Sequence, residues 1–145
     1  RTKWTRALDD RGELFVQAYY DYAELSSQEQ RSAFDLSLHH SFFMDPKHQI
    51  TWGGQVRIAD SHYEGLPGLD FGDDRTDVYA SLFVQDQFEL KPDRLKLVAG
   101  LKLEHTPFQD MEVQPSVRMS YTPNTRTTIW GGISRAVRVP SHAEN

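Results

Sequence analysis

The strongest constraint in this sequence is the regular alternation of apolar and polar residues between positions 78 and 138. Four segments of similar length carry it, and short polar breaks separate them: 78–90, 95–105, 112–122 and 127–138. A period of two marks β-strands, because successive side chains of a strand point to opposite faces, whereas an amphipathic helix repeats every 3.6 residues. We therefore predict strands joined as up-and-down hairpins.

The first half of the chain shows the same pattern at 4–8, 13–22, 32–43 and 49–59. In segment 32–43, Phe34, Leu36 and Leu38 alternate with Asp35 and Ser37. Segment 78–90 is less regular, because Asp86 falls on its apolar face and the sequence offers no explanation for it. In the second half, Leu95, Leu97, Leu101 and Leu103 are expected on one face with Val113, Val117 and Met119, and Lys102 and Arg118 on the other.

Alternating segments of about 9–11 residues separated by turns are typical of transmembrane β-barrels. In lipid every backbone polar group must be paired within the protein, and a closed barrel achieves this with strands. No run approaches the roughly 18 apolar residues of a membrane helix. We therefore predict an all-β fold, in which residues 1–145 form an antiparallel up-and-down transmembrane β-barrel segment of about eight strands.

The predicted connections fall into two sets. One set is short, near 9–12, 45–48, 91–94 and 123–126, and the other is longer, at 23–31, 60–77 and 106–111. Membrane barrels have short periplasmic turns and longer extracellular loops, so 60–77 is expected to be a long extracellular loop. Aromatic residues near the strand ends fit interfacial girdles: Phe42, Phe43, Phe88, Tyr121 and Trp130 at the short-turn end, and Tyr20, Tyr22 and Tyr79 at the other.

Composition excludes some classes of function. The chain has no cysteine, hence no disulfide framework and no thiolate metal site. Its net charge is −5, with both signs interspersed, which does not suit a nucleic-acid surface. No signal peptide precedes the first strand, and the ends carry no cap or turn, so the chain is expected to be part of a longer protein.

No catalytic motif or cofactor is predicted. Ser41 and Ser61 lie near histidines but lack the spacing of a nucleophile elbow or a triad. His39 and His40 are neighbours on one strand and are expected to point to opposite faces, so they cannot share a metal. A calcium site is conceivable where His62 lies near Asp60, Asp70, Asp73 and Asp74, but the Asp-x-Asp-x-Asp-Gly pattern is missing. We therefore interpret these residues as a solvated acidic loop and predict no metal.

The predicted inward face carries Gln55, Arg57, Lys102, Glu104 and Arg118. The simpler interpretation is that these side chains hydrate and salt-bridge the barrel wall, and it is the one we favour. Alternatively, Arg57 and Lys102 attract an anionic ligand into the lumen. Arg57, His62 and Lys102 are therefore the weak candidates for ligand binding.

The region 79–141 resembles the barrel of TonB-dependent outer-membrane receptors. The resemblance rests on four phrases in order at hairpin spacing: YASLFVQDQFEL (79–90), PDRLKLVAGLKLEH (92–105), VQPSVRMSYTPN (113–124) and TIWGGISRAVRVPS (128–141). GELFVQAYYD (12–21) is also similar but less specific. Most of the remaining chain resembles the family only loosely.

The resemblance implies a receptor, embedded in the lipid of the bacterial outer membrane, that takes up a scarce nutrient complex such as a ferric siderophore, haem or cobalamin. Such barrels have about 22 strands and a plugged lumen, so eight strands are roughly a third of one. The plug and the segment that contacts TonB are not within these residues, so transport is not expected of this chain alone. The ligand contacts of the family lie outside the matched phrases, and no ligand residue is carried over.

Two other classes of function remain open from the sequence. One is a complete small eight-stranded membrane barrel with a structural or adhesion role. The other is a soluble ligand-binding barrel of the lipocalin type, which requires apolar residues inside and polar residues outside. Alternation alone does not say which face is inside, so the facing of the strands must decide between the last class and the membrane barrels.

Overall fold

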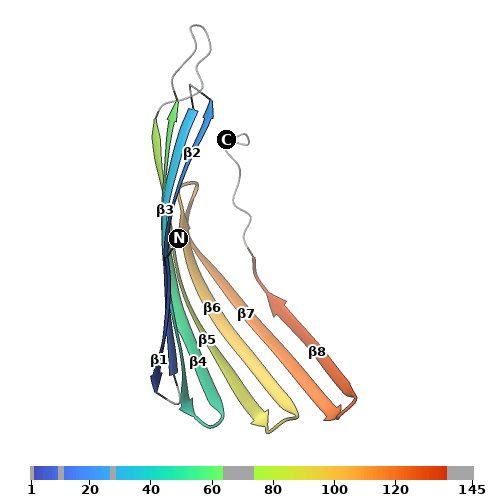
Figure 1. Cartoon of the computed structure of the whole chain (residues 1–145). Coiled ribbons are helices and arrows are strands. Elements are labelled where there is room, and N and C mark those ends of the chain that lie inside the picture. Colours follow the sequence, from blue (N-terminus) through green and yellow to red (C-terminus); the bar gives the residue numbers. More distant parts are fainter. Residues whose placement is uncertain (1, 10–11, 27–28, 64–73, 137–145) are drawn as a thin grey trace.

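The computed structural model describes residues 2–9, 12–26, 29–63 and 74–136, which form one sheet of eight strands (Figure 1). The strands are β1 (Thr2–Asp9), β2 (Gly12–Ser26), β3 (Glu29–Asp45), β4 (His48–Tyr63), β5 (Arg75–Lys91), β6 (Leu95–Thr106), β7 (Gln109–Asn124) and β8 (Thr127–Ser134). Each strand pairs antiparallel with the next one in the chain. The described part of the chain contains no helix long and apolar enough to cross a membrane. The prediction of an all-β, antiparallel, up-and-down fold is confirmed.

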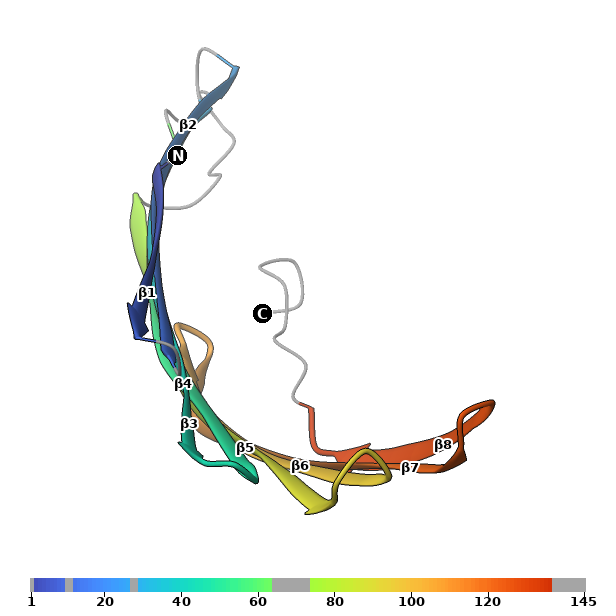
Figure 2. The ribbon, with the colours of Figure 1, turned by 60° about the horizontal axis from the view of Figure 1, so that its bottom comes forward.

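The sheet bends into an open arc (Figure 2). Within the described residues, strands contact only their neighbours in sequence, so β1 and β8 form two separate edges. The eight strands therefore form a curved wall, and they do not close into a small barrel.

Strands β2 to β5 are longer than the sequence pattern predicts. They have 15, 17, 16 and 17 residues, whereas about 9–11 suffice to cross a bilayer. The extra residues lie at the upper end in Figure 1, where parts of the predicted loops 23–31 and 60–77 continue the ladder. Most side chains of these extra residues are polar on both faces of the sheet, so the sequence shows no alternation there. Their backbones nevertheless pair with the neighbouring strands. The central part of the predicted loop 60–77, residues 64–73, lies outside the described residues.

The β6–β7 connection differs from the expectation of a longer loop at 106–111. Thr106 and Gln109 end the two strands, and only Pro107 and Phe108 lie between them. The predicted contrast between short and long connections therefore fails at this hairpin. The polar residues after His105 indicate a break in the alternation. They are compatible with a long loop, but also with the two-residue turn that contains Pro107.

The connections β1–β2, β3–β4, β5–β6 and β7–β8 all lie at the lower end of the sheet (Figure 1). In the β3–β4 turn, Asp45 Oδ1 accepts hydrogen bonds from the backbone N–H groups of Lys47 (2.7 Å) and His48 (2.9 Å). The Lys47 hydrogen bond is the main reason that the pKa of Asp45 lies below its usual value. In the β5–β6 turn, Asp93 has a φ of 58°.

The polar face of the sheet is the more buried one. Along β3, Phe34 and Leu36 are 44% and 43% exposed, whereas Asp35 and Ser37 are 1% and 8% exposed. Side chains on the concave side of a curved sheet converge and shield one another, so the polar face is concave and the apolar face is convex. A soluble lipocalin-type barrel requires the opposite arrangement, with its apolar side chains inside.

The register confirms the predicted facing of the second half. Leu97 pairs with Met119 and Leu103 with Val113 on the convex face, whereas Lys102 pairs with Gln114 on the concave face. Asp86 does lie on the convex face, as its position implies, and the structure supplies its partner. His48 Nδ1 is 2.7 Å from Asp86 Oδ2, and the His48 ring stacks on Phe88 at 4.2 Å.

The predicted aromatic girdles are only partly right. Phe42, Phe88 and Tyr121 lie on the convex face at the turn end, and Tyr20 and Tyr22 lie on the same face at the opposite end. Three other members were placed wrongly, because their register puts them on the concave face: Phe43, Tyr79 and Trp130. Nearness to a strand end does not determine the face, which depends on whether the position is odd or even within the strand.

Candidate functional site on the concave face

Cross-strand hydrogen bonds organise the polar wall. Gln55 Nε2 on β4 donates to Asp35 Oδ2 on β3 at 2.6 Å. Further along the sheet, Gln114 Nε2 on β7 donates to Glu104 Oε2 on β6 at 2.6 Å, and Lys102 Nζ, on the same strand as Glu104, donates to Glu104 Oε1 at 2.8 Å. Polar pairs of this kind stabilise adjacent strands of a sheet. They also fix the positions of the carboxylates that line the hollow of the arc.

A cavity of about 420 Å³ lies on this wall, in the upper half of the sheet. It is lined by Gln55, Arg57, Ala59, Tyr79, Ala80, Ser81 and Glu104. Arg57 lies in the ladder between Asp35 of β3 and Tyr79 of β5, and it is exposed. No ion pair joins its guanidinium to any other residue that the structure describes. The cavity therefore presents an unpaired cation beside a phenol.

A second cavity, of about 310 Å³, shares Arg57, Ala59 and Tyr79 with the first. Its lining also includes Arg31 and Asp77. Asp77 is 7% exposed and pairs with the Arg75 side chain at 2.5 Å, whereas Arg57 and Arg31 are exposed. Asp77 is thus buried in the wall while the Arg57 guanidinium faces the hollow, although the exposed residues Asp21 and Asp60 also line this second cavity. A guanidinium in this position can bind an anionic group of a ligand.

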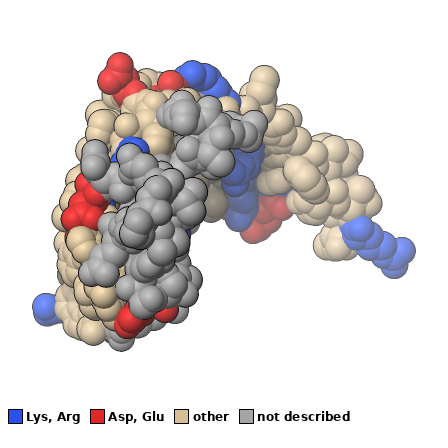
Figure 3. Space-filling view, turned by 90° about the horizontal axis from the view of Figure 1, so that it is seen from above, with Lys and Arg blue, Asp and Glu red and all other residues tan. Residues whose placement is uncertain are grey.

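Seen from above, basic and acidic side chains are mixed over the visible surface, and basic ones lie within the hollow of the arc (Figure 3). Long-range attraction of a highly charged partner would require a larger patch of one sign. Any electrostatic attraction that this face exerts on a ligand is therefore local.

The structure separates the three candidate ligand-binding residues. Lys102 is on the same face as Arg57, but its charge is compensated by Glu104. His62 lies on the opposite, convex face near the upper end of β4, because it is five positions from Arg57 in one strand. Its Nδ1 is 2.5 Å from an Asp74 oxygen, and both side chains are more than half exposed.

The possible calcium site does not assemble among the residues that are described. Asp60 accepts a hydrogen bond from Thr76 at 2.7 Å, and Asp74 is paired with His62. Asp70 and Asp73 lie outside the described residues. Within the described ranges, no three His, Asp or Glu side chains form a group that could hold a metal ion.

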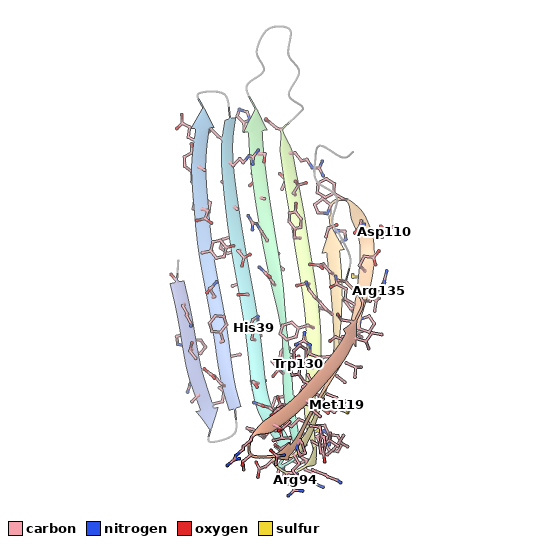
Figure 4. All side chains as sticks on the ribbon, turned by 90° about the vertical axis from the view of Figure 1, so that its right-hand side faces the viewer. His39, Arg94, Asp110, Met119, Trp130 and Arg135 are labelled. Carbon is pink, nitrogen blue, oxygen red and sulfur yellow. The ribbon has the colours of Figure 1, made fainter. Side chains whose placement is uncertain are left out.

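Sequence reasoning missed Tyr79, which was assigned to a girdle. The sequence could have placed Tyr79 on the polar face, because Asp77, Tyr79 and Ser81 are alternate positions of one strand and therefore share a face. It also missed an aromatic row lower on the concave wall, where His39 lies on β3 (Figure 4). The His39 ring is 5.5 Å from Phe15 and 5.3 Å from Phe83, and Gly53 is its ladder partner.

Comparison with known proteins identifies the family. A family profile described as TonB dependent receptor-like, beta-barrel matches residues 2–145. No curated protein and no solved structure matches the chain. Members of the matched family are transporters of the bacterial outer membrane and are not enzymes. The open antiparallel wall and the match along nearly its whole length lead to one conclusion: the chain belongs to the TonB-dependent receptor family and forms part of its β-barrel domain.

Proposed function

We propose that the eight strands are part of the wall of a larger closed barrel in the bacterial outer membrane, in a receptor that takes up a scarce nutrient complex. The candidates are a ferric siderophore, haem and cobalamin. The observation that carries this proposal is the inverted burial along β3, where Asp35 is 1% exposed and Leu36 is 43% exposed. Membrane barrels place apolar side chains toward lipid and polar ones toward the lumen.

The height of the apolar surface supports a membrane crossing. On β3, alternate residues from Phe34 to Phe42 face the convex side, and on β4 those from Ile50 to Ile58 do so. Nine residues at ~3.3 Å each span roughly 26–30 Å along a strand, near the apolar band of about 25 Å once the strand tilts. The lower turns would then face the periplasm, and the polar upper ends of β2 to β5 would face the outside.

Within the lumen, the proposed ligand contact is the pair of cavities around Arg57. Their position below the upper strand ends suits a ligand that enters from outside. An exposed guanidinium beside Tyr79 offers charge-assisted hydrogen bonds to an anionic group, and these are stronger than neutral hydrogen bonds. Lys102 and His62 are assigned no direct contact, because one is paired with Glu104 and the other lies on the convex face.

The test is a binding titration of the receptor that carries these strands, with ferric siderophores, haem and cobalamin as probes. Arg57→Gln is expected to weaken binding of the true ligand by about 1.5 kcal/mol, roughly tenfold. Arg118→Gln is the matched control, since Arg118 is an exposed arginine lower on the same face. If none of these probes binds the unaltered receptor, the proposed function is wrong. If both variants bind like the unaltered receptor, the assignment of Arg57 is wrong.

A further inference from the structure

The cavity of about 310 Å³ near the upper end of the concave wall has an apolar floor. Three alanines line it, Ala23, Ala33 and Ala59, and Ala33 is 9% exposed. Ala33 pairs with Asp21 of β2 on one side and with Ala59 of β4 on the other. A methyl group fills little of the space above a sheet. The hollow therefore exists because alanines occupy the positions between the charged residues.

Charged residues of both signs surround this floor. Arg57 on β4 and Asp21 on β2 are exposed, and no ion pair joins either side chain to another residue that the structure describes. The other charged residues that line the cavity already take part in interactions: Asp77, Asp60 and Arg31. Among the described residues, one cation and one anion are thus left unpaired at the rim of a single cavity.

The register keeps Arg57 and Asp21 apart. Asp21 lies in the same ladder row as Ala59, whereas Arg57 lies one row lower on the concave face. Because β3 separates β2 from β4, the two backbones are ~12 Å apart, taking ~4.8 Å between neighbouring strands and ~3.3 Å per residue. The two charged groups can therefore contact different ends of one ligand, while its middle part lies on the alanine floor.

We propose that this cavity binds a part of the nutrient complex that carries both an anionic group and an ammonium group, with Arg57 on the anion and Asp21 on the ammonium. The inference rests on the proposed function, and it adds to it a second contact residue and a requirement for mixed charge. A ligand with anionic groups alone would bring negative charge toward the unpaired Asp21, which is unfavourable. A ligand with both charges gives each side chain a charge-assisted hydrogen bond.

Three small probes separate the two charges. One is ε-aminocaproate, which carries both; ε-hydroxycaproate carries only the carboxylate, and aminohexanol carries only the ammonium. Their dissociation constants are measured by saturation-transfer NMR on the detergent-solubilised receptor that carries these strands, with receptor-free micelles as the blank. We expect ε-aminocaproate to bind about tenfold more tightly than either other probe, because each of those lacks one charged hydrogen bond.

Two conservative variants should remove this preference from opposite ends. In Arg57→Gln, ε-aminocaproate should bind no more tightly than aminohexanol, and in Asp21→Asn it should bind no more tightly than ε-hydroxycaproate. Glu13→Gln is the matched control, because Glu13 is an exposed carboxylate near the lower end of the same face of β2. Ala59→Leu fills the floor without changing a charge, and it should weaken the binding of all three probes. The two charge variants suffice for the test, should Ala59→Leu fail to fold.

Equal binding of the three probes, or binding of none, would overturn the mixed-charge site. An unchanged preference in Asp21→Asn would overturn the assignment of Asp21. The titration with ferric siderophores, haem and cobalamin tests the proposed function separately. If one of these ligands binds through Arg57 while ε-aminocaproate shows no preference, only the mixed-charge site is wrong. If ε-aminocaproate shows the expected pattern and none of these ligands binds, the site is correct and the proposed nutrient is wrong.

Discussion

At the scale of single residues, a glycine shapes the concave aromatic row. Gly53 is the ladder partner of His39, and a Cβ built on it would lie 2.3 Å from the backbone oxygen of Leu38 and 2.9 Å from the rings of His39 and Phe83. The missing side chain lets the two rings meet edge to face over the strand. The sequence alone does not distinguish Gly53 from Gly54. The two glycines are adjacent in β4 and face opposite sides of the sheet, and only Gly53 lies beneath the two rings.

Gly53→Ala is therefore expected to destabilise the receptor by about 1–3 kcal/mol, the usual cost of overpacking, because the backbone oxygen of Leu38 cannot move aside. Gly131→Ala is the control, since a Cβ there would meet nothing within 4 Å. Urea unfolding in detergent measures both variants. Equal stability of the two would show that the close approach at Gly53 is relieved without cost.

At the scale of the strand, odd and even positions determine which medium a side chain meets. On β5, Val84 faces the convex side near the middle of the apolar rows, and its neighbour Gln85 faces the concave side. Asp86 departs from this rule and is accommodated by His48. That pairing joins residues 38 apart in the chain, so the alternation within one strand could not reveal it.

Val84→Arg should destabilise the membrane-inserted receptor by about 2–4 kcal/mol, because it places a charge on the lipid face near the midplane. Gln85→Arg, one residue further, should have a much smaller effect, since the new charge points into the polar hollow. Unfolding from lipid vesicles by urea compares the two. Similar losses for both variants would contradict the assignment of the convex face to lipid.

At the scale of the whole molecule, β1 and β8 are two open edges of a sheet whose exposed face is apolar. Open edges pair with other strands, and an exposed apolar face associates in water. Neither edge is satisfied within the described residues. In the receptor, neighbouring barrel strands are the expected partners.

The isolated 145-residue chain is accordingly expected to aggregate or to pair edge to edge in plain buffer, and to require detergent to remain dispersed. It should bind a ferric siderophore or cobalamin weakly, because most of the lumen wall is missing. Size-exclusion chromatography with and without detergent, together with a ligand titration, measures this. A detergent-free monomer with micromolar or tighter affinity would argue for the soluble ligand-binding barrel.

The sequence by itself determined the class of fold, the strand centres and the two faces of most strands. These follow from local alternation, since the pleat sends every second side chain to the same side. It also determined the family resemblance, which depends on the order of short phrases. The predicted loop lengths were less accurate, because polar residues pair their backbones in a strand without leaving an apolar pattern.

Only the tertiary structure decided which face is concave, which connection is long and which charges are paired. Curvature arises from the pairing of all eight strands, so the burial of Asp35 beside Leu36 cannot be read from β3 alone. Among the candidate ligand residues, Lys102 pairs with Glu104 two residues further along β6, while Arg57 is left facing the cavity. The partners that join different strands, such as Asp35 for Gln55 and Glu104 for Gln114, are set by the register between strands, a property that no single strand contains.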